Sequence, residues 1–115
     1  MVTKGIDRCL FAFPPEEWAA FKANIKANAN LSARGRQLSR MFFSMAFEAT
    51  LDRQGRVLIP TKLAQYAGLR RDVTITGVDD RLEIWDTEEW NRYVAGADES
   101  FVDIIEEFAG REFGV

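Results

Sequence analysis

One segment of this 115-residue chain occurs twice, at an offset of 72 positions. Residues 5–21 align without gaps on residues 77–93, and chance would supply about one identity over such a length. The aligned segments share six: Gly5/Gly77, Asp7/Asp79, Leu10/Leu82, Glu16/Glu88, Glu17/Glu89 and Trp18/Trp90. The elements expected ahead of the second copy, residues 46–69, would fall before Met1 if they were shifted back by 72. We therefore interpret the chain as one and a half repeat units.

Composition limits the chemistry that this chain can perform. It has no histidine and a single cysteine, Cys9, inside an apolar run. We expect a buried, unreactive thiol, since no histidine is present to activate it. Zinc sites and histidine-based acid/base catalysis are disfavoured for the same reason. With no glycine-rich phosphate loop and no apolar run of membrane-spanning length, the sequence predicts a cytoplasmic protein that is not an enzyme and needs no cofactor or metal.

The formal net charge of −3 conceals an uneven distribution. Residues 31–76 carry eight basic and three acidic side chains, whereas residues 77–115 carry three basic and twelve acidic ones. A basic central segment permits local contact with nucleic acid despite the acidic whole. A solvated helix face followed by a solubilising acidic end explains the same numbers equally well.

Hydrophobic periodicity predicts a chain of short strands and helices. Pro14-Pro15 and Ser32 mark two helix starts separated by a break near 28–31, and Thr87 is the expected N-cap of a third. Gly68 should end a short helix over 61–69. The expected strands are 9–13, 46–51, 56–60, 73–78 and 81–85, and the expected helices begin at 14–15, span 32–45 and 61–69, begin at 87, and span about 99–109 as a separate last helix.

The sharpest local signal is the run Asp52-Arg53-Gln54-Gly55-Arg56 between two strand-like segments. Gly55 suits the left-handed position of a three-residue hairpin loop, and Asp52 can accept hydrogen bonds from the loop amides. A rigid turn that presents Arg53 and Arg56 suits recognition of phosphate or guanine. The spacing alone favours a simpler interpretation, in which Asp52 and Arg56 pair to staple the turn.

Three further arginines lie on the predicted helix 32–45. Arg34, Arg36 and Arg40 are interpreted as a solvated face or as partners of carboxylates, and not as DNA contacts.

The motifs DxxGRxxIP from Asp52, GxDxxLEIW from Gly77 and GxDxCLFxxPxxEW from Gly5 occur together with the segment RQLSRMFFS. In this combination the chain, from about residue 2 to residue 95, resembles the MraZ family of bacterial transcriptional regulators of the division and cell-wall gene cluster. The resemblance implies an α+β fold of tandem AbrB-like swapped-hairpin units with peripheral helices, the first unit incomplete.

The same resemblance implies a function. It implies sequence-specific binding to short direct repeats in promoter DNA by a ring-shaped homo-oligomer located at the nucleoid. By this analogy the DNA-binding residues are Asp52, Arg53, Gly55 and Arg56, with Arg56 contacting DNA, Asp52 positioning the loop and Arg53 adding a phosphate contact.

The resemblance also divides the chain into segments. Residues 1–30 correspond to the back half of a first repeat with its helix, 31–46 to a connecting helix, 47–97 to a complete second repeat and 98–115 to an acidic C-terminal helix. A complete member of the family begins with a front hairpin that this chain lacks. A late gene start, an incomplete sequence and a shortened protein are competing explanations for its absence. We expect half of an interleaved fold to leave strand 9–13 without partners.

A second class of function stays open beside DNA binding. The chain could be a protein-interaction module, either antitoxin-like or an assembly-only relic. The helical stripe Phe101, Ile104, Ile105 and Phe108 within the acidic end suits docking on a folded neighbour.

Overall fold

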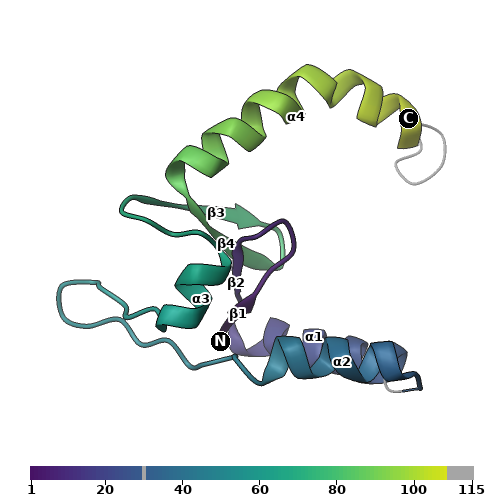
Figure 1. Ribbon diagram of the computed structural model, residues 1–115, viewed down its shortest axis with the longest axis vertical. Helices are drawn as coiled ribbons and strands as arrows, with labels where there is room; N and C mark the ends of the chain where they lie inside the picture. The colour runs from purple at the N-terminus through teal and green to yellow at the C-terminus, as the bar shows by residue number, and fades with distance from the viewer. Residues whose placement is uncertain (30, 109–115) are drawn as a thin grey trace.

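The computed structural model describes residues 1–29 and 31–108 (Figure 1). The chain has an α+β fold in which two β-hairpins are each followed by a long helix, with two further helices between α1 and the second hairpin. The elements are β1 (Val2–Lys4), β2 (Leu10–Ala12), α1 (Pro15–Ala29), α2 (Ala33–Phe43), α3 (Thr61–Tyr66), β3 (Val73–Val78), β4 (Arg81–Asp86) and α4 (Thr87–Phe108).

The strands form one antiparallel sheet in the order β1-β2-β4-β3, so the two hairpins meet through their second strands. In the central pairing Leu10 lies opposite Ile84, and Ala12 lies opposite Leu82. Because Leu10 corresponds to Leu82 and Ala12 to Ile84 across the 72-residue offset, this register maps onto itself when the hairpins are exchanged. A pseudo-two-fold axis therefore passes between β2 and β4, and the sequence repeat is also a repeat of structure.

Strand 9–13 is not left without partners, contrary to the sequence-based expectation. Its central part, β2, pairs with β1 on one side and with β4 on the other. Strand β1 was not predicted from the sequence. It supplies the missing neighbour because the chain reverses at Asp7 and Arg8, which both adopt positive φ.

The core lies on both faces of the sheet. One cluster joins Leu10 and Ile84 to Leu63 of α3, with Ile59 packed against it. The other cluster is aromatic and packs α1 and α2 against the sheet; its buried members are Cys9, Phe11, Phe13, Trp18 and Trp85. Cys9 is fully buried, as expected, and burial raises the pKa of its thiol to about 12.

The predicted strands 46–51 and 56–60 do not form. Phe47, Ala49 and Ile59 do pack against the core, so the expected alternation of side chains is present. Only Phe47 pairs with the sheet, through two 2.9 Å backbone hydrogen bonds with Val2. The reason is the length of the available edge: β1 has three residues and offers a place for one bridge rather than a ladder.

The predicted separate helix at 99–109 is also wrong within the described residues, and residue 109 lies outside them. Helix α4 runs without interruption from Thr87 to Phe108. Gly96 in a helix interior costs about 1 kcal/mol relative to alanine, which weakens a helix without ending it. The apolar residues from Trp90 to Phe101 also lie on one side of a single helix, so the helix does not need to break between them.

The other predicted boundaries need smaller adjustments. Helix α1 ends at Ala29, close to the expected break, and Ser32 caps α2 by accepting a 2.9 Å hydrogen bond from the Gly35 amide. Helix α2 ends at Phe43 and α3 at Tyr66, and Gly68 adopts the left-handed conformation expected of a helix stop. Among the described helices, none combines the length and the apolar character that crossing a membrane requires.

Candidate nucleic-acid interface

The turn at residues 52–56 is a closed loop held by its own backbone. The Asp52 amide donates to the Arg56 carbonyl at 2.8 Å, and the Gly55 amide donates to the Asp52 carbonyl at 3.0 Å. Gly55 has a φ of 78°, the left-handed region that the sequence predicted for it. A hairpin turn therefore forms even though its two arms are not strands.

The carboxylate of Asp52 organises the interior of this turn. Oδ1 accepts hydrogen bonds from the amides of Gln54 at 2.9 Å and Arg56 at 2.8 Å. Oδ2 accepts from Arg56 Nε at 3.1 Å. The Arg56 amide, the Arg56 guanidinium and the Gln54 amide together hold the pKa of Asp52 below its usual value. The carboxylate is therefore fully ionised at neutral pH and is occupied by the loop itself.

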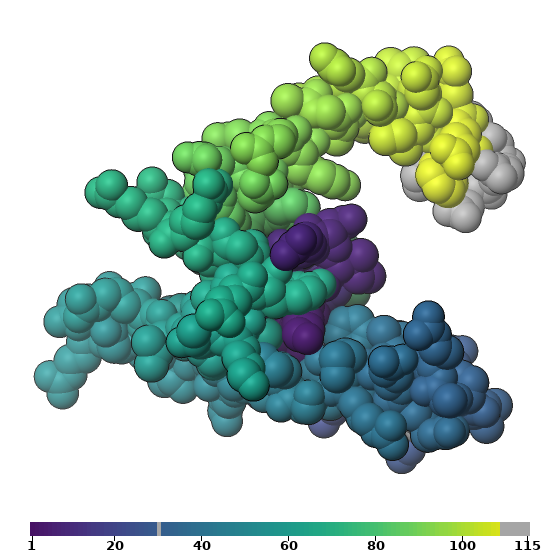
Figure 2. Space-filling model, in the orientation of Figure 1, coloured from purple at the N-terminus to yellow at the C-terminus, as the bar shows by residue number. Residues whose placement is uncertain are grey.

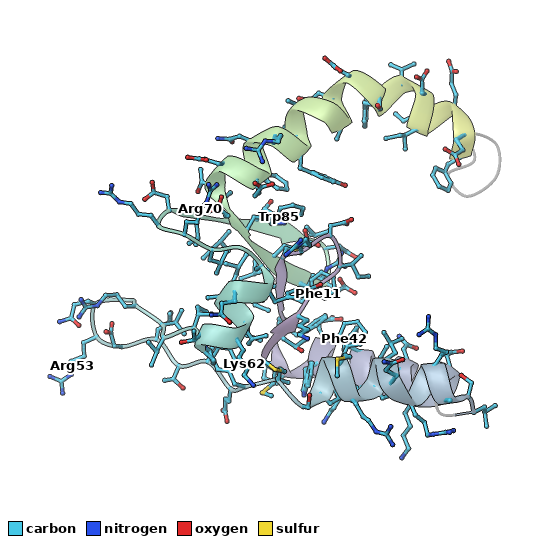
Figure 3. All side chains as sticks on the ribbon, in the orientation of Figure 1. Phe11, Phe42, Arg53, Lys62, Arg70 and Trp85 are labelled. Atoms are coloured by element: carbon cyan, nitrogen blue, oxygen red, sulfur yellow. The ribbon has the colours of Figure 1, made fainter. Side chains whose placement is uncertain are left out.

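The two arginines of the turn differ in how firmly they are held. The Arg56 guanidinium is fixed by Asp52 and by Gln54 Oε1, which accepts from Nη2 at 3.2 Å, yet 74% of this side chain is exposed. Arg53 lies at the outer end of the loop and points away from the body of the protein (Figure 3). The turn thus presents one oriented and one extended cation.

Gln54 was not singled out from the sequence. Its side chain orients Arg56 by accepting the Nη2 hydrogen bond, so it belongs to the candidate site. Its position inside the Asp52–Arg56 run was the only available signal, because an amide in a turn is common and carries no charge.

The structure contains the staple that the sequence predicts between Asp52 and Arg56, and this staple leaves part of the Arg56 side chain available. The predicted staple is present, since the two side chains form an ion pair at 3.1 Å. The ion pair leaves donors of Arg56 available, because no described bond uses Nη1 and most of the side chain remains exposed. An exposed pair of this kind adds little to stability and mainly sets direction.

The turn stands apart from the rest of the molecule. It projects at one side in Figure 1, and the far ends of α1 and α2 lie at the opposite side. The space-filling view shows the same projection, with no other element covering the tip from this side (Figure 2). A long, rod-like ligand such as a duplex could therefore approach Arg53 and Arg56 freely.

The arginines of α2 are placed as the sequence predicted. Arg34, Arg36 and Arg40 are all exposed, and Arg34 donates to Gln37 at 3.4 Å. Within the described residues none of the three forms an ion pair, so they constitute a solvated face and not a set of carboxylate partners.

Arg70 forms a contrasting, internal arrangement. It donates to buried Asp86 at 2.7 Å and to Glu88 at 2.9 Å, joining the chain before β3 to the start of α4. The Arg70 guanidinium holds the pKa of Asp86 below its usual value. This arginine is engaged by two carboxylates and links the chain before β3 to the end of β4 and the start of α4.

A family model described as "MraZ protein, putative antitoxin-like" matches residues 42–112, which include the turn, α3, β3, β4 and α4. The chain belongs to the MraZ family. Membership of the MraZ family points to a role in transcription regulation, and it sets the chain among regulators rather than enzymes. The matched segment begins five residues before the Phe47 bridge and contains every residue of the candidate site.

Proposed function

We propose that this MraZ family member is a sequence-specific DNA-binding regulator acting on the promoter of a division and cell-wall gene cluster. It binds as a homo-oligomeric ring at the nucleoid of the cytoplasm. The observation that supports the proposal best is the 52–56 turn, which presents two exposed guanidinium groups on a closed, internally hydrogen-bonded loop.

The contacts of each residue support the role proposed for it. Arg56 is oriented by Asp52 and Gln54 and keeps donors free, so it is suited to the acceptor pair of a guanine edge or to a phosphate. Arg53 extends from the tip and is suited to a phosphate contact, which positions the protein without reading sequence. Asp52 and Gly55 are positioning residues: Asp52 holds the amides, and Gly55 permits the left-handed backbone.

The test uses fluorescence anisotropy with a labelled duplex of the promoter region, compared with a duplex in which the direct repeats are scrambled. Arg53→Ala should weaken binding to both duplexes by a similar factor. It should also reduce the magnitude of the slope of log K against log salt by about 0.9 for each lost phosphate contact. Arg56→Ala should weaken the free energy of binding to the promoter duplex by about 1–3 kcal/mol. It should also reduce the difference in affinity between the two duplexes.

Arg36→Ala is the matched control, because it removes the same charge from the solvated face of α2, away from the turn. Unchanged affinity in the Arg53→Ala, Arg56→Ala double variant would show that the turn does not contact DNA. A loss in Arg36→Ala equal to that of the turn variants would show that net charge, and not the turn, determines binding.

A protein-interaction module is the second candidate function, and helix α4 is the observation that favours it. Phe101 is 59% and Ile104 is 43% exposed on a helix that has no buried residue within the described chain. In Figure 2 the later part of this helix extends away from the sheet. Consistent co-purification of one small partner protein, lost in Phe101→Ser, together with absent DNA binding, would favour this function.

A further inference from the structure

An apolar cavity lies where the β1–β2 turn, α2 and α3 meet. Its volume is about 400 Å³, which is within the range of protein cavities that hold small molecules. Ile6 contributes from the turn and Tyr66 from the end of α3. The wall from α2 consists of Leu38, Met41 and Phe42. Leu38 and Met41 are each 46% exposed and Ile6 is 63% exposed, so these side chains line an open cavity and not a packed core.

Two cations border this cavity without a carboxylate partner. Lys4 is half-buried, and its Nζ lies 5.2 Å from the centre of the Tyr66 ring and 4.0 Å from Met41 Sδ. Arg8 is exposed at the same border, together with Asp7. Within the described chain none of Lys4, Asp7 and Arg8 forms an ion pair. The border therefore has an excess of positive charge, and the Lys4 ammonium faces apolar groups where an anion would stabilise it.

The hairpin that carries these cations does not need them. Across the 72-residue offset Lys4 corresponds to Thr76 and Arg8 to Asp80, so the second hairpin forms without either positive charge. Arg8 also adopts a φ of 59°, a left-handed conformation that is unfavourable for an arginine, whereas Asp80 does not have a positive φ. Unneeded charge and a strained backbone at the border of a cavity are typical of a ligand-binding site.

We propose that this cavity binds a medium-chain carboxylate, an unbranched apolar chain that ends in one anionic head. The head accepts hydrogen bonds from Lys4 and Arg8, and the chain packs against Ile6, Leu38 and Met41. An anion without the chain gains only an exposed ion pair, which contributes little. A neutral chain leaves the Lys4 ammonium without a partner. Both parts of the ligand are therefore required for binding.

Methionine methyl signals in an NMR spectrum report on the cavity directly. The chain labelled with methyl-13C methionine has three such signals, from Met1, Met41 and Met45. Sodium octanoate should shift the Met41 signal with a Kd of about 1 mM, as expected for a ligand of this size. Met1 and Met45 do not line the cavity, so their signals are internal controls. Acetate should shift none of the three, and 1-octanol should bind about two- to tenfold more weakly than octanoate.

Three variants separate the charge of the site from its apolar wall. Lys4→Gln should weaken octanoate binding about two- to tenfold and leave octanol binding unchanged, because only the anionic head needs the ammonium. Leu38→Ser should weaken the binding of both ligands, because both bury a chain. Lys22→Gln is the matched control, since Lys22 lies 6.0 Å from the centre of the Trp18 ring in a similar arrangement but does not line the cavity. No DNA is present, so the outcome does not depend on the proposed function.

Three results would overturn the proposal. One is an unchanged Met41 signal at about tenfold the expected Kd of octanoate. Another is equal affinity for octanoate and octanol in the wild-type chain, with Lys4→Gln unaffected, which would show that the cavity takes any apolar chain. The third is an equal loss of octanoate binding in Lys22→Gln and Lys4→Gln, which would show that the effect follows the net charge of the protein and not the cavity.

Discussion

Asp52→Asn separates two effects of opposite sign on DNA affinity. The substitution preserves the size of the side chain and removes its charge. The carboxylate accepts from two amides and from Arg56 Nε, all at 2.8–3.1 Å. Asparagine retains one acceptor oxygen and turns an NH2 donor toward one side of this arrangement, so the Arg56 bond or an amide bond must be lost.

The expected magnitudes decide the net sign. Removing a negative charge near DNA strengthens binding, but an exposed charge is screened at 0.1 M salt, where the Debye length is ~10 Å, so we expect a gain of less than about twofold. Releasing Arg56 weakens binding, because charge-assisted hydrogen bonds are roughly twice as strong as neutral ones and here they orient the guanidinium before DNA arrives. We expect the Kd to rise by about fivefold, with an unchanged salt slope since no cation is removed.

The measurement is fluorescence anisotropy at several salt concentrations with the promoter duplex. Asp103→Asn provides the control, because it removes the same charge from the exposed surface of α4. Tighter binding by Asp52→Asn than by the wild-type chain would refute the positioning role and leave Asp52 as a simple repulsive charge.

Three further predictions concern the body of the protein. Burial raises the pKa of the Cys9 thiol to about 12, so alkylation by iodoacetamide at pH 8 should follow unfolding and be negligible in the native protein; rapid modification without urea would contradict this. Gly96→Ala should raise the free energy of unfolding by about 0.5–1 kcal/mol because open space surrounds its Cβ. Gly35→Ala should lower it by about 1–3 kcal/mol, since the new Cβ would lie 1.7 Å from the Ala29 carbonyl oxygen. Urea titration measures both, and equal signs would contradict the packing argument.

The elements that the sequence predicted well are those specified by local chemistry. Ser32 caps α2, Gly68 ends the segment after α3, and Gly55 closes the turn, each through a conformation or bond that one residue type supplies. The 72-residue offset also indicated which hairpins correspond. Strand β1 escaped prediction because three residues cannot show a period, and residues 1–4 share no identity with residues 73–76.

The errors arose where pairing depends on a distant neighbour. Phe47, Ala49 and Ile59 alternate as strand residues should, and they face the core accordingly. Whether such a segment becomes a strand depends on a free edge of sufficient length, and no local pattern encodes the length of β1. Similarly, the sequence predicted a separate last helix at about 99–109, whereas the apolar residues before and after Gly96 lie on one continuous helix, Thr87–Phe108.

The number of cations in the turn connects DNA binding to assembly. Two arginines per chain, if both contact phosphate, give a salt slope near −1.8, so affinity would fall roughly tenfold between 50 and 200 mM salt. Proteins that make 6–10 phosphate contacts lose about 10³–10⁵ over the same range, so three or more copies must act together to reach that class. DNA binding should therefore be cooperative in protein concentration. A non-cooperative isotherm with a slope near −1.8 would show that a single copy binds alone and that assembly plays no part.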